Sequence, residues 1–149
     1  MRLLSLQLLV SVALLVAGIP LQAEEPTIPP RADSFYADLG GMEGIRKFTH
    51  TFIGLITRDE RIKDKFEDAD LERLERLLAE QFCDLSGGPC HYSGRDMRSV
   101  HAHRDIRTAQ FNALTEDLQI AMEQNAVPSA AANKLIAKLA PMVRDVVTQ

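Results

Sequence analysis

The sequence predicts an all-α fold, and three observations lead to this prediction. From residue 34 onward, apolar side chains recur every three or four positions, which is the period of a helix with one buried face. No segment in this range alternates apolar and polar residues as a half-buried strand would. Glycine or proline separates several of the periodic segments. We therefore expect residues 34–149 to form one domain of helices around a single core.

Residues 1–23 have the features of a signal peptide. Arg2 supplies a short positive region, residues 8–18 are apolar except for Ser11, and Leu21-Gln22-Ala23 offers a cleavage site that ends in the small residue Ala23. A retained membrane anchor is the alternative, but the run is shorter than the roughly 20 residues that span a bilayer. We expect export to the periplasm or to another compartment outside the cytoplasm.

Residues 24–33 contain three prolines and predict a short extended arm. Cleavage after Ala23 would remove only one charged side chain, Arg2, and would change the formal net charge from −4 to −5. This mild acidity argues against binding to nucleic acid or to an anionic membrane surface after cleavage.

Two helices are expected before residue 57. Residues 35–39 predict a short helix that ends at Gly40 and Gly41. The apolar face of the second, longer helix consists of Ile45, Phe48, Phe52 and Ile56.

Two aspartates predict the starts of the next helices, because an aspartate side chain can accept hydrogen bonds from the first free backbone N–H groups. Asp59 is expected to cap a short helix that carries Ile62 and Phe66. Asp70 is expected to cap a helix with the apolar stripe Leu71, Leu74, Leu78, Phe82 and Leu85. Two later stripes are Phe111, Leu114, Leu118 and Met122, and then Leu135, Leu139, Met142 and Val146, where Pro141 is expected to bend or break the helix.

Residues 82–101 are the most informative stretch. Gly87, Gly88 and Pro89 end one helix, because glycine permits the closing left-handed turn and proline cannot continue the helix. A short helix near residue 95 then places His101 on the same face as Met97 and Val100. A histidine among apolar side chains is most often a neutral core residue. It is also a suitable ligand for a metal or for haem iron.

Cys83 and Cys90 flank this glycine turn and are the two cysteines of the chain. In an exported protein they predict a disulfide, with two buried thiols as the alternative. A zinc site that includes His91 and His103 has spacings that match no common pattern. His103 itself is expected to be exposed.

Several motifs together resemble the truncated haemoglobins, and within them the group 1 proteins with double-glycine motifs. The resemblance covers about residues 35–147. It rests on Phe-Tyr-x-x-Leu-Gly-Gly at 35–41, Phe52, Asp59, Phe66, Gly87-Gly88-Pro89, Tyr92-x-Gly94, Met97-x-x-x-His101, Ile106, Phe111 and Leu139-Ala140-Pro141.

The resemblance implies a two-over-two helical sandwich around one haem b. His101 would be the iron ligand, with its second ring nitrogen donating to a backbone carbonyl. Phe66 would pack on the porphyrin, and the pocket walls would include Phe52, Met97, Phe111 and Leu118. Tyr92, Arg95 and Arg98 would lie near the haem propionates, although a solvated role for the arginines is nearly as well supported.

The residues matching the distal, ligand-binding side are apolar. Where relatives commonly have tyrosine and glutamine, this chain has Ile53, Leu74 and Leu78. Without a hydrogen-bond donor worth roughly 1–3 kcal/mol, oxygen should be released quickly. His50 and Gln81 share helical faces with these residues, and each is expected at the pocket edge. The matching position for a second iron-binding histidine is Leu77.

These features favour a haem protein that reversibly binds oxygen, nitric oxide or carbon monoxide and is served by an unidentified reductant. An enzyme on the same scaffold, such as a nitric oxide dioxygenase or a peroxidase, is less favoured. The apolar pocket would not hold oxygen well, and the chain has no flavin or nicotinamide domain. A haem-free helical module would leave the histidine and glycine pattern unexplained.

Overall fold

The computed structural model describes residues 34–149, so the predicted signal peptide and extended arm lie outside the described residues. Within this range the regular structure is helical, without strands, as predicted. The elements are α1 (Gly41–Ile56), η1 (Lys63–Lys65), α2 (Leu71–Leu85), α3 (Met97–His101), α4 (Thr108–Gln124), α5 (Ser129–Leu139), η2 (Ala140–Met142) and α6 (Val143–Val146), where η denotes a 3₁₀ helix.

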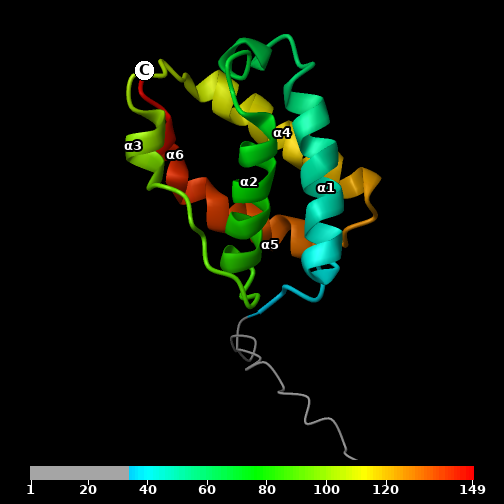
Figure 1. Cartoon of the computed structure of the whole chain (residues 1–149). Helices are drawn as coiled ribbons and strands as arrows, with labels where there is room; N and C mark the ends of the chain where they lie inside the picture. Colours follow the sequence, from blue (N-terminus) through cyan, green and yellow to red (C-terminus); the bar gives the residue numbers. More distant parts are fainter. Residues whose placement is uncertain (1–33) are drawn as a thin grey trace, which may run out of the picture.

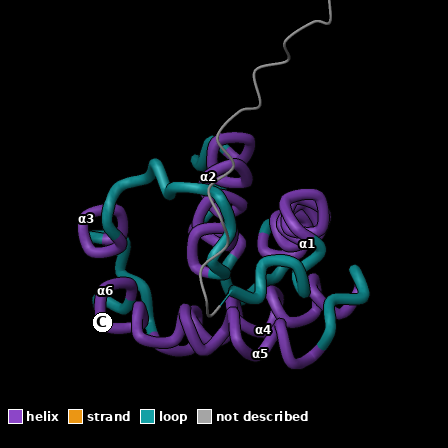
Figure 2. The backbone as a smooth tube through the Cα atoms, turned by 90° about the horizontal axis from the view of Figure 1, so that it is seen from below, coloured by secondary structure: helices purple, strands orange, loops and turns teal. Residues whose placement is uncertain are grey.

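The helices form two layers. Figure 1 shows α1 and α2 side by side, and Figure 2, seen from below, shows both lying over α4 and α5. Short helices α3 and α6 lie together at one end of the molecule. This arrangement is the predicted sandwich of two helices over two.

The core lies between the two layers. Phe48 and Phe52 of α1 pack against Phe82 of α2, with ring centroids 5.7 and 6.5 Å apart. Leu118 and Met122 of α4 are also buried in this core. The apolar stripes of α1, α2 and α4 therefore face one another, as the sequence predicts.

One short predicted helix is not formed, and the other is present only as the 3₁₀ helix η1, which begins after Ile62 and ends before Phe66. Residues 35–39 form a turn, in which Leu39 N donates to the Phe35 carbonyl and Gly40, with φ of 82°, reverses the chain before α1. Asp59 does not cap a helix. Its side chain instead accepts from the backbone N–H of Arg61, two residues on.

The predicted break at Pro141 is confirmed. Helix α5 ends at Leu139, Pro141 lies inside η2, and α6 then continues toward α3. Between residues 34 and 149, no helix has both the length and the apolar character needed to cross a bilayer.

The link between α3 and α4 is held by the C-terminal residues. The carbonyl of Ile106 accepts from the backbone N–H groups of Thr148 and Gln149, and Ile106 N donates to Thr148 Oγ1. Two residues of this link have positive φ, His103 at 63° and Asp105 at 49°. His103 is exposed, as expected.

Candidate functional site

Three cavities meet at His101. Their volumes are about 490, 220 and 180 Å³. Both His101 of α3 and Leu78 of α2 line all three, so the cavities lie around the space between these two helices. Most of the other lining side chains are apolar. The chain therefore has a divided, mostly apolar space with one imidazole at its centre.

Local hydrogen bonds fix the orientation of His101. Asp96 caps the five-residue helix α3 by accepting from the backbone N–H of Ser99 at 2.9 Å. His101 Nδ1 lies 2.7 Å from the carbonyl oxygen of Met97. Because a carbonyl can only accept, Nδ1 carries a proton, so the neutral form of the ring has its lone pair on Nε2. This is the predicted bond, and it leaves Nε2 able to bind a metal.

Helix α3 is anchored to α6 by an ion pair. The guanidinium of Arg98 donates to Asp145 Oδ1 from Nη2 at 2.7 Å and from Nε at 3.0 Å. This pair raises the pKa of Arg98 above its ordinary value. Arg98 lines none of these cavities, so it lies on the outer side of α3 rather than beside the predicted propionates.

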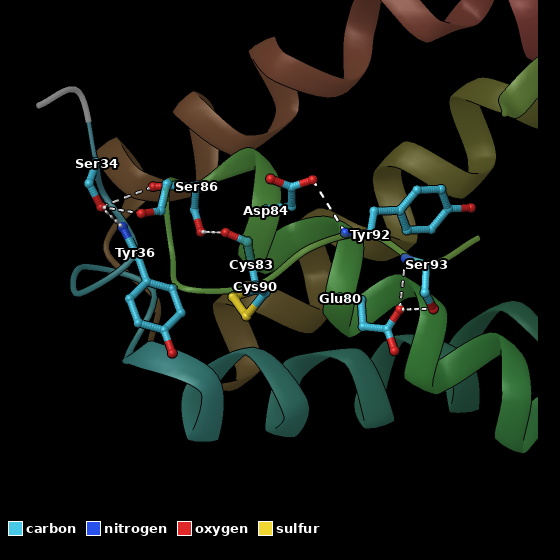
Figure 3. Close-up of a disulfide and its surroundings, with 10 residues drawn as sticks. Ser34, Tyr36, Glu80, Cys83, Asp84, Ser86, Cys90, Tyr92 and Ser93 are labelled. Carbon is cyan, nitrogen blue, oxygen red and sulfur yellow. Dashed lines mark hydrogen bonds between the residues drawn. A yellow bond between two sulfur atoms is a disulfide. The ribbon is translucent and has the colours of Figure 1, made fainter. Parts of the chain in front are cut away.

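The segment between α2 and α3 is attached to α2 by several bonds. The predicted disulfide joins Cys83 of α2 to Cys90 (Figure 3). The side chain of Asp84 accepts from Tyr92 N, and Glu80 accepts from both N and Oγ of Ser93. Hydrogen bonds to Ser93 lower the pKa of Glu80, so it remains an ionised acceptor. The chain that leads to His101 is thus held against the last two turns of α2.

One glycine of the turn, Gly88, lies where a larger side chain would not fit. A Cβ at this position would lie 2.5 Å from the Tyr36 ring and 2.6 Å from Cys83 Sγ. Both neighbours are packed, so a larger side chain would displace the ring or the disulfide. Gly87 has φ of 86°, the left-handed conformation expected at the end of α2.

Nine of the ten residues predicted to contact the cofactor line at least one cavity. They are Phe52, Phe66, Leu74, Leu78, Tyr92, Met97, His101, Phe111 and Leu118. The tenth, Ile53, is buried at 7% exposure in the core and lines none of these three cavities.

The two polar residues considered for the pocket have different positions. The side chain of His50 is 80% exposed, and its Nδ1 lies 3.2 Å from Glu75 on the surface of the molecule. Gln81 is buried and lines two of the three cavities. Its Nε2 lies 3.7 Å from the sulfur atoms of Met97 and Met142. Gln81 is therefore inside the site and His50 is outside it.

Basic side chains lie at two edges of the site. Arg73 and Arg95 line the smallest cavity, and Lys65 and Arg104 line the 220 Å³ cavity. Tyr92 also lines the smallest cavity and donates its hydroxyl to the Arg95 carbonyl at 3.1 Å. Burial raises the pKa of the Tyr92 hydroxyl, which favours this protonated donor form.

Part of the lining was predicted only as core. The C-terminal helices contribute Leu139, Met142 and Val146, and α4 contributes Leu114. Their helical spacing is the same for a core residue and for a pocket residue, so the sequence does not separate the two roles. Ile136 also lines this cavity and was not among the predicted residues.

The zinc alternative is not supported. Cys83 and Cys90 are joined to each other, and residues 34–149 contain no group of three or more His, Cys, Asp or Glu side chains arranged to hold a metal ion. The alternative of two buried thiols is excluded by the same disulfide.

Comparison with known proteins identifies the fold and the family. The profile of the family described as bacterial-like globin matches residues 34–148. The group 1 truncated haemoglobin GlbN of Mycolicibacterium paratuberculosis is 28% identical over 115 residues, which cover 77% of this chain and 85% of that protein. The group 1 truncated haemoglobin of Tetrahymena pyriformis is 26% identical over 104 residues, which cover 70% of this chain and 86% of that protein.

Solved structures of truncated haemoglobins superpose on this chain. The truncated haemoglobin of Tetrahymena pyriformis in its Fe(III) form superposes with a TM-score of 0.73 at 24% identity, covering 76% of this chain and 97% of that one. The 2/2 haemoglobin of Synechococcus, with covalently attached haem, superposes with a TM-score of 0.72 at 21% identity, covering 78% of this chain and 99% of that one. The chain therefore belongs to the bacterial-like globin family and has the two-over-two fold of the truncated haemoglobins.

Proposed function

We propose that this chain binds haem b through His101 and uses it to bind a small diatomic ligand reversibly. The observation that carries this proposal is the position of His101. Its Nδ1 is committed to the Met97 carbonyl at 2.7 Å, and its ring lines all three cavities of the site. An imidazole held in this tautomer within an apolar space is well suited to bind haem iron through Nε2.

The surrounding residues suit a flat, mostly apolar group with an anionic edge. Phe52, Phe66 and Phe111 contribute aromatic surface to the cavity walls. In residues 34–149, neither Arg73 nor Arg95 forms an ion pair, so both are available for carboxylates at the edge. Leu74 and Leu78 would keep water away from the side facing α2.

When bound, haem would supply an iron that His101 would hold through Nε2 and that could bind a small ligand. Oxygen, nitric oxide and carbon monoxide are the proposed ligands, with a reductant that keeps the iron ferrous. The haemoglobin names of the relatives support this proposal, as does the covalently attached haem of the Synechococcus protein.

The experiment is a spectral titration of the purified domain with haem, next to His101→Ala. The parent should give a Soret band that sharpens and shifts when carbon monoxide is added to the ferrous form. His101→Ala should bind haem at least tenfold more weakly, because the iron–imidazole bond is lost. The variant His91→Ala is the control, because His91 is an exposed histidine that lines none of the three cavities. Absence of haem uptake by the parent protein would refute the proposal.

We further propose that the protein acts after export and cleavage near Ala23. The apolar N-terminal segment and the disulfide between Cys83 and Cys90 support an oxidising compartment. Fractionation of an expressing cell, followed by the intact mass of the secreted form, tests the proposal. A full-length chain found only in the cytoplasm would contradict it.

A further inference from the structure

We infer that Gln81 is a positioning residue for His101, because its side-chain amide holds the helix that carries this histidine against α2 and η2. The inference rests on the proposed haem function and assigns a role to a position that none of the motifs used above includes. Gln81 Nε2 lies 3.7 Å from Met97 Sδ of α3 and 3.7 Å from Met142 Sδ of η2. One amide group therefore joins three elements at the wall of the largest cavity.

The surroundings of this amide show why its contacts matter. Gln81 is only 7% exposed, and a buried amide costs free energy unless its N–H groups find acceptors. An apolar side chain of similar length would fill the same space without this cost. The amide has two N–H groups, and the structure provides two acceptors, one sulfur atom from each of two other elements. Thioether sulfur is a weak acceptor, so the amide acts through both contacts together.

Met97 is the residue through which this contact reaches His101. The backbone carbonyl of Met97 accepts the hydrogen bond from His101 Nδ1 at 2.7 Å, and the side chain of the same residue contacts Gln81. A hydrogen bond at one ring nitrogen raises the basicity of the other nitrogen, the one that binds a metal. Displacement of Met97 would therefore weaken the bond that orients the imidazole and would make Nε2 a poorer electron donor.

The other side-chain attachments of α3 act at different places. Arg98 holds the outer side of α3 to α6. From α2, Glu80 bonds to Ser93, which precedes the first residue of α3 by four positions. Gln81 follows Glu80, and its amide reaches Met97 within α3 itself. Its contact therefore fixes the inner side of α3, the side that lines the largest cavity.

The experiment compares the haem-loaded parent protein with Gln81→Met, which keeps a similar length and removes both N–H groups. Amide hydrogen exchange of residues 97–101 should be about fivefold faster in the variant, the factor for the loss of one hydrogen bond. The iron–imidazole stretching band of the ferrous form should move to lower frequency, because the bond from Nδ1 to the Met97 carbonyl is weakened. Gln119→Met, at an exposed position on α4, is the matched control and should equal the parent in both measurements.

Two further variants separate positioning of His101 from a general loss of stability. Ser93→Ala removes the hydroxyl bond to Glu80 without touching Met97, so it should leave the stretching band unchanged. Met97→Leu removes the sulfur atom and should reproduce the shift caused by Gln81→Met. The double variant should shift the band no further, since both changes break the same contact.

If Gln81→Met binds haem, as read from its Soret band, but keeps the parent stretching frequency and exchange rates, the inference is wrong while the proposed function stands. A shift of equal size in Ser93→Ala would also overturn the inference, because it would trace the effect to general loosening. If the parent itself binds no haem, both proposals fail. Gln81→Leu is the second variant should Gln81→Met not fold, and the same two measurements decide.

Discussion

At the scale of single residues, Asp117 stands out among the described side chains because one of its buried oxygens has no hydrogen-bond partner. It lies on α4 with 5% exposure, and its buried Oδ2 has no hydrogen-bond partner. Burial, followed by the nearby charge of Asp59, raises the pKa of Asp117 above its ordinary value. Hydrogen bonds from Arg61 lower the pKa of Asp59, so the neighbouring carboxylate remains ionised.

Substitution of Asp117 by asparagine should therefore stabilise the domain at neutral pH. The raised pKa means that the folded state binds a proton more tightly than the unfolded state. This contribution to stability is fully present below the ordinary pKa and is lost as pH rises through the raised value. Asp117→Asn has no charge to desolvate, so its unfolding free energy at pH 7 should exceed that of the parent by about 1–2 kcal/mol.

Urea unfolding of both proteins from pH 3.5 to 8 measures this difference. The gain should shrink as the pH falls, since the parent Asp117 becomes protonated. Glu123→Gln, at an exposed position of the same helix, removes one charge without removing a buried one. An equal gain from this control would show that the effect comes from net charge and not from burial.

The roles of single residues could be predicted to different degrees. The resemblance to the truncated haemoglobins implied the bond from His101 to a backbone carbonyl, and the structure has this bond, whereas iron binding by His101 stays a prediction. Gln81 was only partly predicted. The spacing puts it on the pocket side of α2, but whether such a side chain lies inside or at the edge depends on Met97 and Met142, which come from other elements.

At the scale of elements, the disulfide attaches the segment between α2 and α3 to α2. Cys83 is fully buried in α2, and Cys90 lies in the following segment (Figure 3). Replacing both cysteines by alanine should lower the unfolding free energy by roughly 2–3 kcal/mol, the chain-entropy value for so short a loop. Guanidinium unfolding of the oxidised parent and of the double variant measures the loss.

The hydrogen bonds of Glu80 and Asp84 remain in that variant. Amide hydrogen exchange should therefore rise mainly in residues 86–91, and helix α3 should stay protected. Chemical reduction of the parent protein is the control, because it breaks the disulfide without removing sulfur atoms from the core. If reduction leaves the unfolding free energy unchanged, the disulfide does not stabilise the domain.

The longer helices and the short helix α3 were predicted, whereas the helix expected over residues 35–39 is not formed. Helices α1, α2 and α4 carry apolar stripes long enough to overcome the cost of starting a helix. Residues 35–39 are too few to do so before Gly40 reverses the chain. The carboxylate of Asp59 could cap a helix, but it accepts a hydrogen bond from Arg61 N within a local turn. The helix that follows is the 3₁₀ helix η1, whose N-cap is Ile62.

At the scale of the whole molecule, the site and the core are the same structure. Every α-helix contributes at least one side chain to the walls of the largest cavity, for example Phe52 from α1 and Val146 from α6. A group that binds there contacts all parts of the fold at once. Binding should therefore stabilise the whole domain cooperatively and not one region of it.

Haem should raise the thermal midpoint in a concentration-dependent way. Free haem at a thousand times its dissociation constant would add about 4 kcal/mol. Metal-free protoporphyrin IX is the control ligand, because it offers the same apolar surface without the iron. His101→Ala should lose most of the stabilisation by haem and keep that by the metal-free porphyrin. Equal effects of the two ligands on the parent protein would contradict a role for His101 as the iron ligand.

The backbone of the link after α3 also constrains how this protein could be engineered. A left-handed residue other than glycine costs roughly 1–2 kcal/mol, and His103 adopts this conformation directly behind the helix that carries His101. Glycine at this position would relieve the strain, although it would add roughly 0.5–1 kcal/mol of unfolded-chain entropy. Since the relief of strain exceeds this cost, directed evolution of the domain for heat resistance should enrich glycine at position 103.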